Sequence, residues 1–347
     1  MKITQANLIL LILLLIFSCD HKKEEFNGEL IIDFPDPIEL EGEKIFEGEF
    51  GIATISLKDS LLILTTNRDT LFHVYDNNQN FISSFGSQGM GPGEFERPPF
   101  IKDIWKEGGE VKALIYDNIN TVVINISESI RENEVKITEE FELPSEIRHP
   151  IVEVFYNGNN QYIGMYDDRH HQRLDSKRGG FYYNRELGNL DIFPLYNLEI
   201  QPYEIMAAIN INTRTARLSP DRGKFVLALL HSPKLEIFDV GLNSTKRFLL
   251  DTHPPENVFD LEEFNEREIK EFSRNIFVTN NFIYLLYSGN GNGQKIKVIE
   301  WNGKPEAQFS LPEGYDLNWF ITDETNESFY GLSWRDDSIY RFDFKNP

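Results

Sequence analysis

The 347-residue chain carries 56 acidic residues against 34 lysines and arginines, a formal net charge of −22. This charge disfavours nucleic acids and anionic membrane surfaces as partners, because binding their phosphates requires a basic surface. It is typical of a self-repelling, soluble surface and would also suit a cationic ligand. A hydrophobic content of 40% supports a large core, and the single cysteine excludes intramolecular disulfides.

The N-terminus has the features of an export signal. The apolar run Leu8–Phe17 is shorter than the roughly 20 residues of a membrane-spanning helix and fits the core of a signal peptide. Leu15-Ile16-Phe17-Ser18-Cys19 resembles a bacterial lipobox, in which the cysteine is lipidated. We therefore expect a signal peptide over 1–18, a lipidated tether over 19–28 and a lipid anchor on the bacterial cell envelope, at the periplasmic side or the cell surface. The alternative is an ordinary signal peptide with Cys19 as a buried thiol.

Strand-like segments separated by turn residues recur through the rest of the chain. Six copies of a strand–turn–strand unit start about 47 to 63 residues apart, which is the length of a four-stranded propeller blade. The copies lie at 61–76, 111–124, 161–183, 224–239, 282–300 and 329–343. Each is preceded by a further strand, and five are followed by a fourth, such as 81–85. The pattern predicts an all-β fold.

The last copy lacks a fourth strand, whereas the N-terminal part has an unassigned strand at Glu29–Phe34. Pairing this segment with the last copy would close a ring of blades and leave no bare sheet edge. Residues 29–347 are therefore predicted to form a single six-bladed β-propeller, closed by an N-terminal strand. An array of β-sandwiches is the alternative, but it predicts neither six repeats nor the exchange of a terminal strand.

Polar residues gather in the loops between the second and third strands, which emerge on one face of a propeller. Two insertions, at 197–212 and 251–270, are expected on the same face. The candidate ligand-binding residues are Asn67, Arg68, Asp117, Asn118, Asp168, Arg169, His170, His231, Asn290, Trp334, Arg335 and Asp336. Their amides, arginines and tryptophan suit a polar small molecule, a glycan or an envelope protein, although turns alone also favour Asn and Asp.

No metal or other cofactor is expected. Asp168 and His170 would share one face of a strand, but Arg169 between them opposes a cation. The sequence contains no Gly-x-Ser-x-Gly elbow, no usable cysteine nucleophile and no phosphate loop ending in Gly-Lys-Ser/Thr. These absences favour a binding module over an enzyme. The alternative is a propeller hydrolase or lyase that acts on an extracellular polymer, so enzymatic activity stays open.

The stretch Gly86–Phe95 (GSQGMGPGEF), followed by Pro98 and Ile101, resembles the segment that joins blades in NHL-type propellers. Together with the lipobox and the six repeats, the chain resembles the TolB-like six-bladed propeller lipoproteins of bacterial envelopes. This resemblance implies a fold and a location and no particular activity. We expect the stretch to cross from the first blade to the second, with positive φ at Gly89, Gly91 and Gly93 and with Phe95 anchored between the blades.

Overall fold

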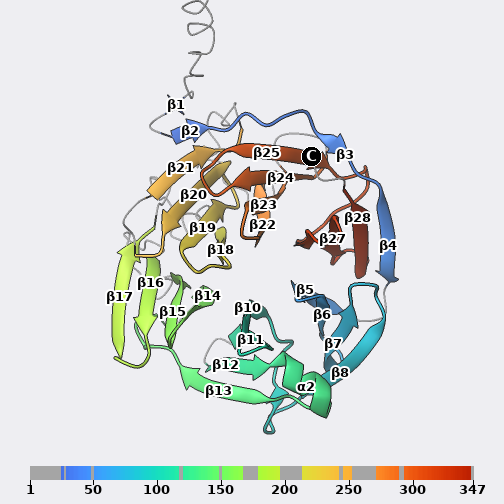
Figure 1. The fold of residues 1–347 in the computed structure, drawn as a ribbon, viewed down its shortest axis with the longest axis vertical. Helices are drawn as coiled ribbons and strands as arrows, with labels where there is room; N and C mark the ends of the chain where they lie inside the picture. The colour runs from blue at the N-terminus through green and yellow to red at the C-terminus, as the bar shows by residue number, and fades with distance from the viewer. Residues whose placement is uncertain are drawn as a thin grey trace, which may run out of the picture.

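The computed structural model is a six-bladed β-propeller, as predicted (Figure 1). Six small sheets surround a central axis, and the four main strands of each blade run antiparallel from the axis outward. The structure describes residues 25–26, 29–47, 51–116, 120–147, 151–166, 179–195, 213–241, 245–251, 271–288 and 293–344. The predicted signal peptide, Cys19 and the insertion at 197–212 lie outside these ranges, as does the insertion at 251–270 apart from Asp251.

The strands of each blade follow one another in chain order from the axis outward. The first blade contains β5 (Ile52–Lys58), β6 (Leu61–Thr66), β7 (Thr70–Asp76), β8 (Phe81–Gln88) and β9 (Glu94–Phe95). The second contains β10 (Ile101–Glu107), β11 (Glu110–Tyr116), β12 (Asn120–Asn125) and β13 (Ile137–Glu142), with helix α2 (Ile126–Glu132) after β12. The third contains β14 (Ile151–Gly158), β15 (Gln161–Tyr166), β16 (Gly179–Asn184) and β17 (Asn189–Pro194).

The remaining blades follow the same order. The fourth contains β18 (Arg214–Leu218), β19 (Lys224–Leu229), β20 (Lys234–Asp239) and β21 (Thr245–Leu249). The fifth contains β22 (Ser273–Val278), β23 (Phe282–Tyr287), β24 (Lys295–Glu300) and β25 (Pro305–Ser310). The sixth contains β26 (Trp319–Asp323), β27 (Ser328–Ser333) and β28 (Ser338–Asp343).

The burial of each strand explains its sequence pattern. Second strands such as β6 and β23 read as nearly continuous apolar runs because neighbouring blades cover both of their faces. The outer strand β8 mixes buried and exposed positions, since part of its surface meets solvent. In the described part of the chain, each of the six interfaces between neighbouring blades holds its own cluster of buried apolar side chains. Phe95 is buried between blades one and two, as predicted.

An N-terminal strand completes the sixth blade, but the predicted segment was wrong. The closing strand is β4 (Gly42–Glu47), which pairs antiparallel with β28. Within the predicted segment Glu29–Phe34, strand β2 (Glu29–Ile31) runs parallel to β21 of the fourth blade instead. The closing strand must end beside the first strand of blade one, and only a short connection separates β4 from β5. The more distant β2 is carried round the rim.

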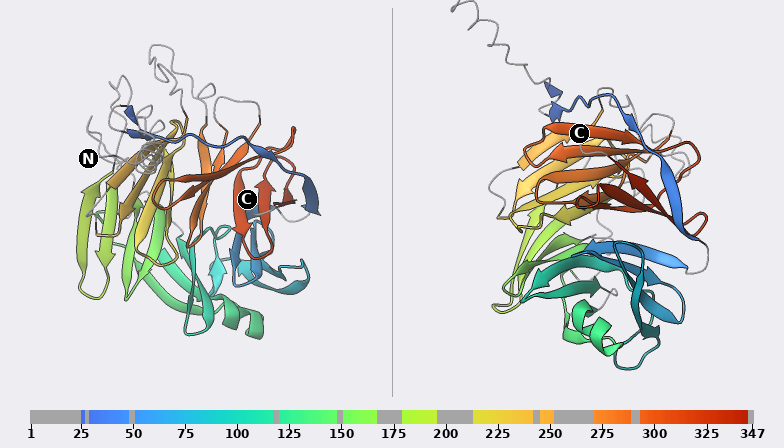
Figure 2. Two further views of the ribbon diagram at one scale, coloured as in Figure 1. Left: turned by 45° about the horizontal axis from the view of Figure 1, so that its top comes forward. Right: turned by 45° about the vertical axis from the view of Figure 1, so that its right-hand side comes forward.

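The whole N-terminal segment forms a belt around three blades. After β2 it crosses the fifth blade, where β3 (Ile38–Glu39) pairs parallel with β25, and then reaches the sixth. Figure 2 shows this segment, in blue, along the rim in both views. A further short strand, β1 (Glu25–Phe26), pairs with β2. The belt therefore ties blades four, five and six together.

The junction between blades six and one is also clamped near the axis. The two carboxylate oxygens of Asp337 each accept a backbone hydrogen bond of 2.8 Å, from the N–H groups of Gly51 and Ile52. The indole Nε1 of Trp334 donates to the carbonyl of Ala53 at 3.2 Å. These contacts come from the loop between β27 and β28, so this loop helps to close the ring.

In the crossover Gly86–Phe95, the backbone conformation of the glycines agrees only in part with the prediction. Gly93 has a positive φ of +76°, as expected, and Gly86 has one of +79°. Gly89 and Gly91 do not have positive φ, so that part of the prediction was wrong. A Cβ at Gly89 would lie 2.0 Å from Oε2 of Glu94, so a larger residue there would displace the Glu94 carboxylate. This oxygen folds back over the loop and accepts a hydrogen bond of 2.8 Å from the Gly91 N–H.

No helix within the described ranges has the length and apolar character needed to cross a membrane.

Candidate functional site

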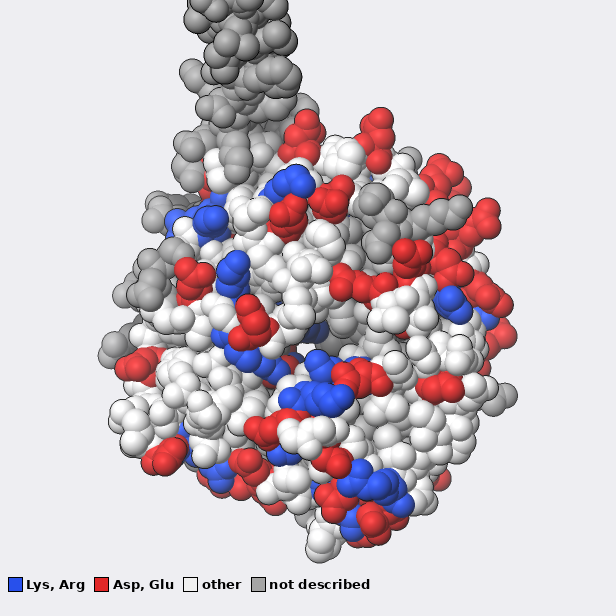
Figure 3. Space-filling view, in the orientation of Figure 1, with Lys and Arg blue, Asp and Glu red and all other residues white. Residues whose placement is uncertain are grey.

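The first strands of the six blades surround the central channel. Each of them contacts the first strands of the two neighbouring blades, in the circular order β5, β10, β14, β18, β22 and β26. Strand direction fixes which residues lie at which end, because every first strand runs from the face of the second-to-third-strand loops to the opposite face. A space-filling view shows a hollow at the centre, bordered by lysines, arginines and acidic residues (Figure 3).

A cavity of about 420 Å³ lies in this channel and is lined by all six first strands. Its lining includes the ends of these strands and the turns that follow them, as at Lys58, Glu107, Gly158 and Arg222. The cavity therefore extends towards the face that carries the first-to-second-strand turns. Its volume lies within the range of about 300–1,000 Å³ that is usual for small-molecule sites.

The lining is rich in positive charge. It contains five cationic residues and two carboxylates, although the chain as a whole carries a net charge of −22. The cationic residues are Lys58, Lys102, Lys106, Arg217 and Arg222, and the carboxylates are Asp103 and Glu107. The charge of the cavity lining is therefore opposite in sign to the net charge of the chain.

An ion pair in the channel links two non-adjacent blades. Arg222 Nη1 of the fourth blade lies 2.7 Å from Oδ2 of Asp103 in the second blade. The same Oδ2 accepts a 3.0 Å hydrogen bond from the Tyr156 N–H, and Oδ1 accepts one of 2.9 Å from the Ile104 N–H. Asp103 therefore fixes the position of the Arg222 guanidinium and joins three blades.

A second set of charges centres on the nearly buried Glu153 in β14. Its Oε1 lies 3.5 Å from Nη1 of Arg217, and its Oε2 lies 3.8 Å from Nζ of Lys102. One carboxylate thus serves two cations at distances longer than those of a tight ion pair. Lys106 pairs with Asp59 of the first blade, whereas Lys58 forms no ion pair with any residue that the structure describes.

Aromatic rings form the apolar part of the cavity wall. The rings of Trp105 and Tyr156 stack with centroids 4.5 Å apart. The guanidinium of Arg217 lies 5.3 Å from the ring centroid of Trp319, which belongs to the sixth blade. Trp105 is 7% exposed, and its Nε1 has no hydrogen-bond partner among the described residues.

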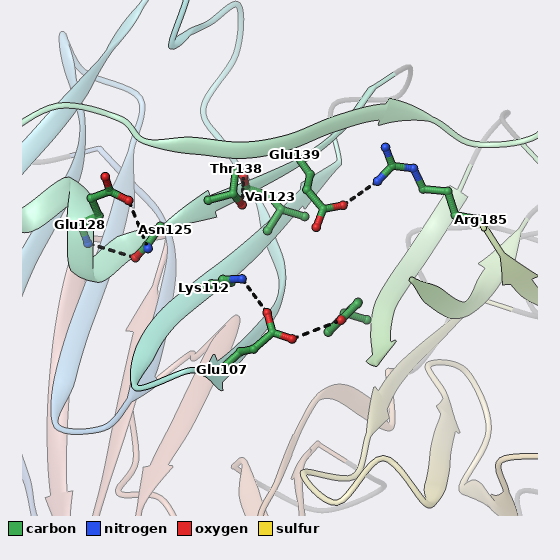
Figure 4. A network of polar contacts seen from close by, with 9 residues as sticks. Glu107, Lys112, Val123, Asn125, Glu128, Thr138, Glu139 and Arg185 are labelled. Atoms are coloured by element: carbon green, nitrogen blue, oxygen red, sulfur yellow. Dashed lines mark hydrogen bonds and ion pairs between the residues drawn. The ribbon is translucent and has the colours of Figure 1, made fainter. Parts of the chain in front are cut away.

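Glu107 connects the second blade to the third at the rim of the cavity (Figure 4). It accepts a hydrogen bond of 2.5 Å from Lys112 Nζ and one of 3.4 Å from the hydroxyl of Tyr156. Burial raises the pKa of Tyr156, and the negative charge of Glu107 raises it further, so the phenol stays protonated at neutral pH. Because Lys112 already pairs with Glu107, this carboxylate does not neutralise the cations of the channel.

The residues predicted from the sequence lie at the other end of the first strands. Six of them are described: Asn67, Arg68, His231, Trp334, Arg335 and Asp336. The other six, namely Asp117, Asn118, Asp168, Arg169, His170 and Asn290, lie outside the described residues. Asp336 pairs with Lys44 of the closing strand and accepts a hydrogen bond from Tyr340. The Asn67 N–H donates to the Gly51 carbonyl at 2.9 Å. Ligand binding by this set stays a prediction.

Sequence reasoning missed the cavity residues because it looked for polar residues in loops. A signal was nevertheless present in the first strands. The segment Ile101–Glu107 (IKDIWKE) carries four charged residues in seven, although strands around the axis of a propeller are enclosed. Charges in a partly enclosed strand require partners, and three of these four residues, Lys102, Asp103 and Lys106, pair with residues of other blades.

Among the described residues, no three His, Cys, Asp or Glu side chains are grouped in a way that could hold a metal ion. The predicted cluster around Asp168 and His170 lies outside the described part of the chain.

No family model matches the sequence, and no curated protein is significantly similar to it. Solved structures share the fold. A member of the DUF4221 family from Bacteroides vulgatus is 11% identical, with a TM-score of 0.53 over 90% of this chain and 100% of that one. A Bacteroides fragilis protein that is predicted to be exported is 12% identical, with a TM-score of 0.50 over 90% of this chain and 98% of that one. At these identities the similarity establishes the six-bladed propeller fold and no more.

Proposed function

We propose that this protein is an envelope-anchored lipoprotein of the TolB-like type, whose propeller binds a small-molecule ligand in the central channel. The observation that carries the binding role is the cavity of about 420 Å³, which has ion-paired side chains and aromatic rings on its walls. Cavities of this size and composition are typical of ligand sites. The lipobox-like sequence that ends at Cys19 supports the anchor.

The anchor is tested by replacing Cys19. The Cys19→Ala variant of the full chain should lose metabolic labelling by an alkyne fatty acid and should leave the membrane fraction. Ser18→Ala is the matched control, because it keeps a small residue before the cysteine and should retain the label. Labelling of Cys19→Ala at the wild-type level would exclude lipidation at this residue.

The binding site is tested by comparing a tryptophan that lines the cavity with one that does not. Trp319 lines the cavity, whereas Trp334 is half-exposed in a loop between the second and third strands. Full-length protein in a non-ionic polyoxyethylene detergent would be titrated by calorimetry with a panel of monosaccharides, amino acids, organic acids and sugar phosphates. Trp319→Leu should weaken any ligand found, and Trp334→Ala should not. The reverse pattern would place the ligand at the loops instead.

A polymer-degrading activity predicts a different result in the same preparation. Incubation with peptides and polysaccharides would then release products, and Trp319→Leu or Arg222→Gln would reduce that release. Binding without turnover is expected for a ligand-binding propeller.

A further inference from the structure

We propose that the channel ligand is a small organic anion, held through a carboxylate or phosphate group. This inference rests on the proposed function, since it assigns a chemical class to the ligand of the same cavity. It follows from three features: the charge balance of the lining, the way the cations are held, and the apolar surface beside them.

The cations in the lining outnumber the carboxylates that neutralise them. Lys102 and Arg217 share the single carboxylate of Glu153 at 3.8 and 3.5 Å. Lys58 has no ion pair with any described residue, and Glu107 is already engaged by Lys112. Arg222 and Lys106 each have a close carboxylate partner, Asp103 and Asp59 respectively. The wall thus retains unbalanced positive charge.

Positive charge in a partly enclosed site is costly unless a counter-charge is present. The side chains of Lys102 and Arg217 are 20% and 16% exposed, so they have lost most of their contact with bulk water. Removal of a charge from water costs free energy that an opposite charge can offset. An anion between these groups would supply it, and the guanidinium of Arg217 could bind a carboxylate or phosphate with two parallel hydrogen bonds.

The overall negative charge of the protein does not oppose this assignment. At physiological ionic strength, charges are screened over about 8 Å, so those on the outer surface act weakly on a ligand in the channel. The local cations decide the sign of the ligand. The excess of acid on the surface indicates solubility, and the sequence-based suggestion of a cationic ligand does not apply to this cavity.

The remaining wall defines the body of the ligand. Trp319, Phe277 and Tyr156 line the cavity beside the cations. A volume of about 420 Å³ holds a compact molecule and not a polymer chain. The site therefore fits a compound with one ring or a short apolar body and an acidic group.

The test compares matched charged and neutral probes on the full-length protein in a non-ionic polyoxyethylene detergent. Benzoate and phenyl phosphate are compared with neutral benzyl alcohol, and glucuronate is compared with neutral glucose. Binding is followed by tryptophan fluorescence and confirmed by calorimetry. At least one anion should bind about tenfold or more tightly than its neutral counterpart, because charge-assisted hydrogen bonds contribute about 1.5–3 kcal/mol each. Benzoate against phenyl phosphate then separates carboxylate from phosphate recognition.

Variants locate the charge that matters. Lys58→Gln should weaken the binding of the anion about tenfold or more, in keeping with the loss of one charge-assisted contact. It should not prevent folding, since Lys58 forms no ion pair with a described residue. Arg217→Gln should do the same, with its melting temperature as a check on folding. Lys246→Gln, an equal charge change on the exposed face of β21, is the control and should bind as the wild type does.

The outcomes separate the two proposals. Tight binding of glucose or benzyl alcohol with no preference for the anions would overturn the anionic assignment and leave the binding function intact. Binding of the anions that Lys58→Gln and Arg217→Gln leave unchanged would also overturn it. If none of these probes binds, and none of the larger panel of monosaccharides, amino acids, organic acids and sugar phosphates does, both proposals are overturned.

Discussion

The buried Lys297 makes the stability of the propeller depend on pH in a way that one substitution should remove. Lys297 lies in β24 and is 5% exposed. Its Nζ donates to the carbonyl of Leu250 and lies 4.0 Å and 4.4 Å from the ring centroids of Tyr287 and Phe34. Burial lowers the pKa of Lys297 from its ordinary value of 10.5 to about 8; nearby Asp251 acts in the opposite direction, and Lys295 adds to the decrease.

The sign of the effect follows from proton binding. Between pH 8 and 10.5 the unfolded chain keeps a proton on Lys297 that the folded chain has lost, so a rise in pH favours the folded state. The cost of the buried charge is fully present below pH 8 and disappears as the pH rises towards 10.5. Each pKa unit corresponds to 1.36 kcal/mol, so the full cost is about 3 kcal/mol, and about 2 kcal/mol of it is relieved between pH 7 and pH 9.5.

The measurement compares urea unfolding of the wild type with that of Lys297→Met across this pH range. The free energy of unfolding of the wild type should rise relative to that of the variant by about 2 kcal/mol from pH 7 to 9.5. Tyrosines and other groups that titrate in both proteins cancel in the difference. Lys246→Met, at an exposed position, is the control and should parallel the wild type.

A difference between wild type and Lys297→Met that stays constant within about 0.5 kcal/mol would refute the reasoning, since it would mean that Lys297 keeps an ordinary pKa. Phe34→Ala gives a second check. Removal of this ring from the N-terminal belt would admit water to the ammonium group and should reduce the pH-dependent difference.

Two further predictions concern the ring itself. Asp337→Ala removes two charge-assisted hydrogen bonds of 2.8 Å and should lower the free energy of unfolding by about 2–3 kcal/mol in urea, whereas the exposed Asp36→Ala should not change it; equal effects from the two would argue against the clamp. Gly164→Ala would place a Cβ 2.3 Å from a backbone carbonyl of the paired strand and should cost about 1–3 kcal/mol. Gly223→Ala, where the nearest atom is 3.5 Å away, should stay within about 0.5 kcal/mol of the wild type, and a tolerated Gly164→Ala would contradict the close approach.

The local pattern of the sequence was sufficient to predict the blades. Apolar runs such as Leu61–Thr66 and Phe282–Tyr287 must be strands buried on both faces, and the turn residues between them set the length of each hairpin. Six repeats and one incomplete blade then required an N-terminal strand to close the ring. The strands and turns depend on residues close together in the chain, and the number of blades follows from the number of repeats. The sequence alone provides both kinds of information.

The sequence alone could not identify the closing strand, because its identity depends on the path of the N-terminal segment in the folded protein. Both Glu29–Phe34 and Gly42–Glu47 can form strands, and only the path of the belt around the rim assigns β2 to the fourth blade and β4 to the sixth. The glycines of the crossover illustrate the same limit. Composition predicted positive φ at Gly89 and Gly91, but in the folded loop neither has it, and the carboxylate of Glu94 lies against both.

The sequence by itself therefore determined the class of fold, the number of blades and the expectation of an exported, anchored protein. Only the tertiary structure decided where a ligand has room and which charges face it. Arg222 and Asp103 are 119 positions apart and meet across the channel at 2.7 Å. No local pattern encodes such a pairing, because it arises from the closure of six blades around one axis, which brings the ends of distant strands to the same small volume.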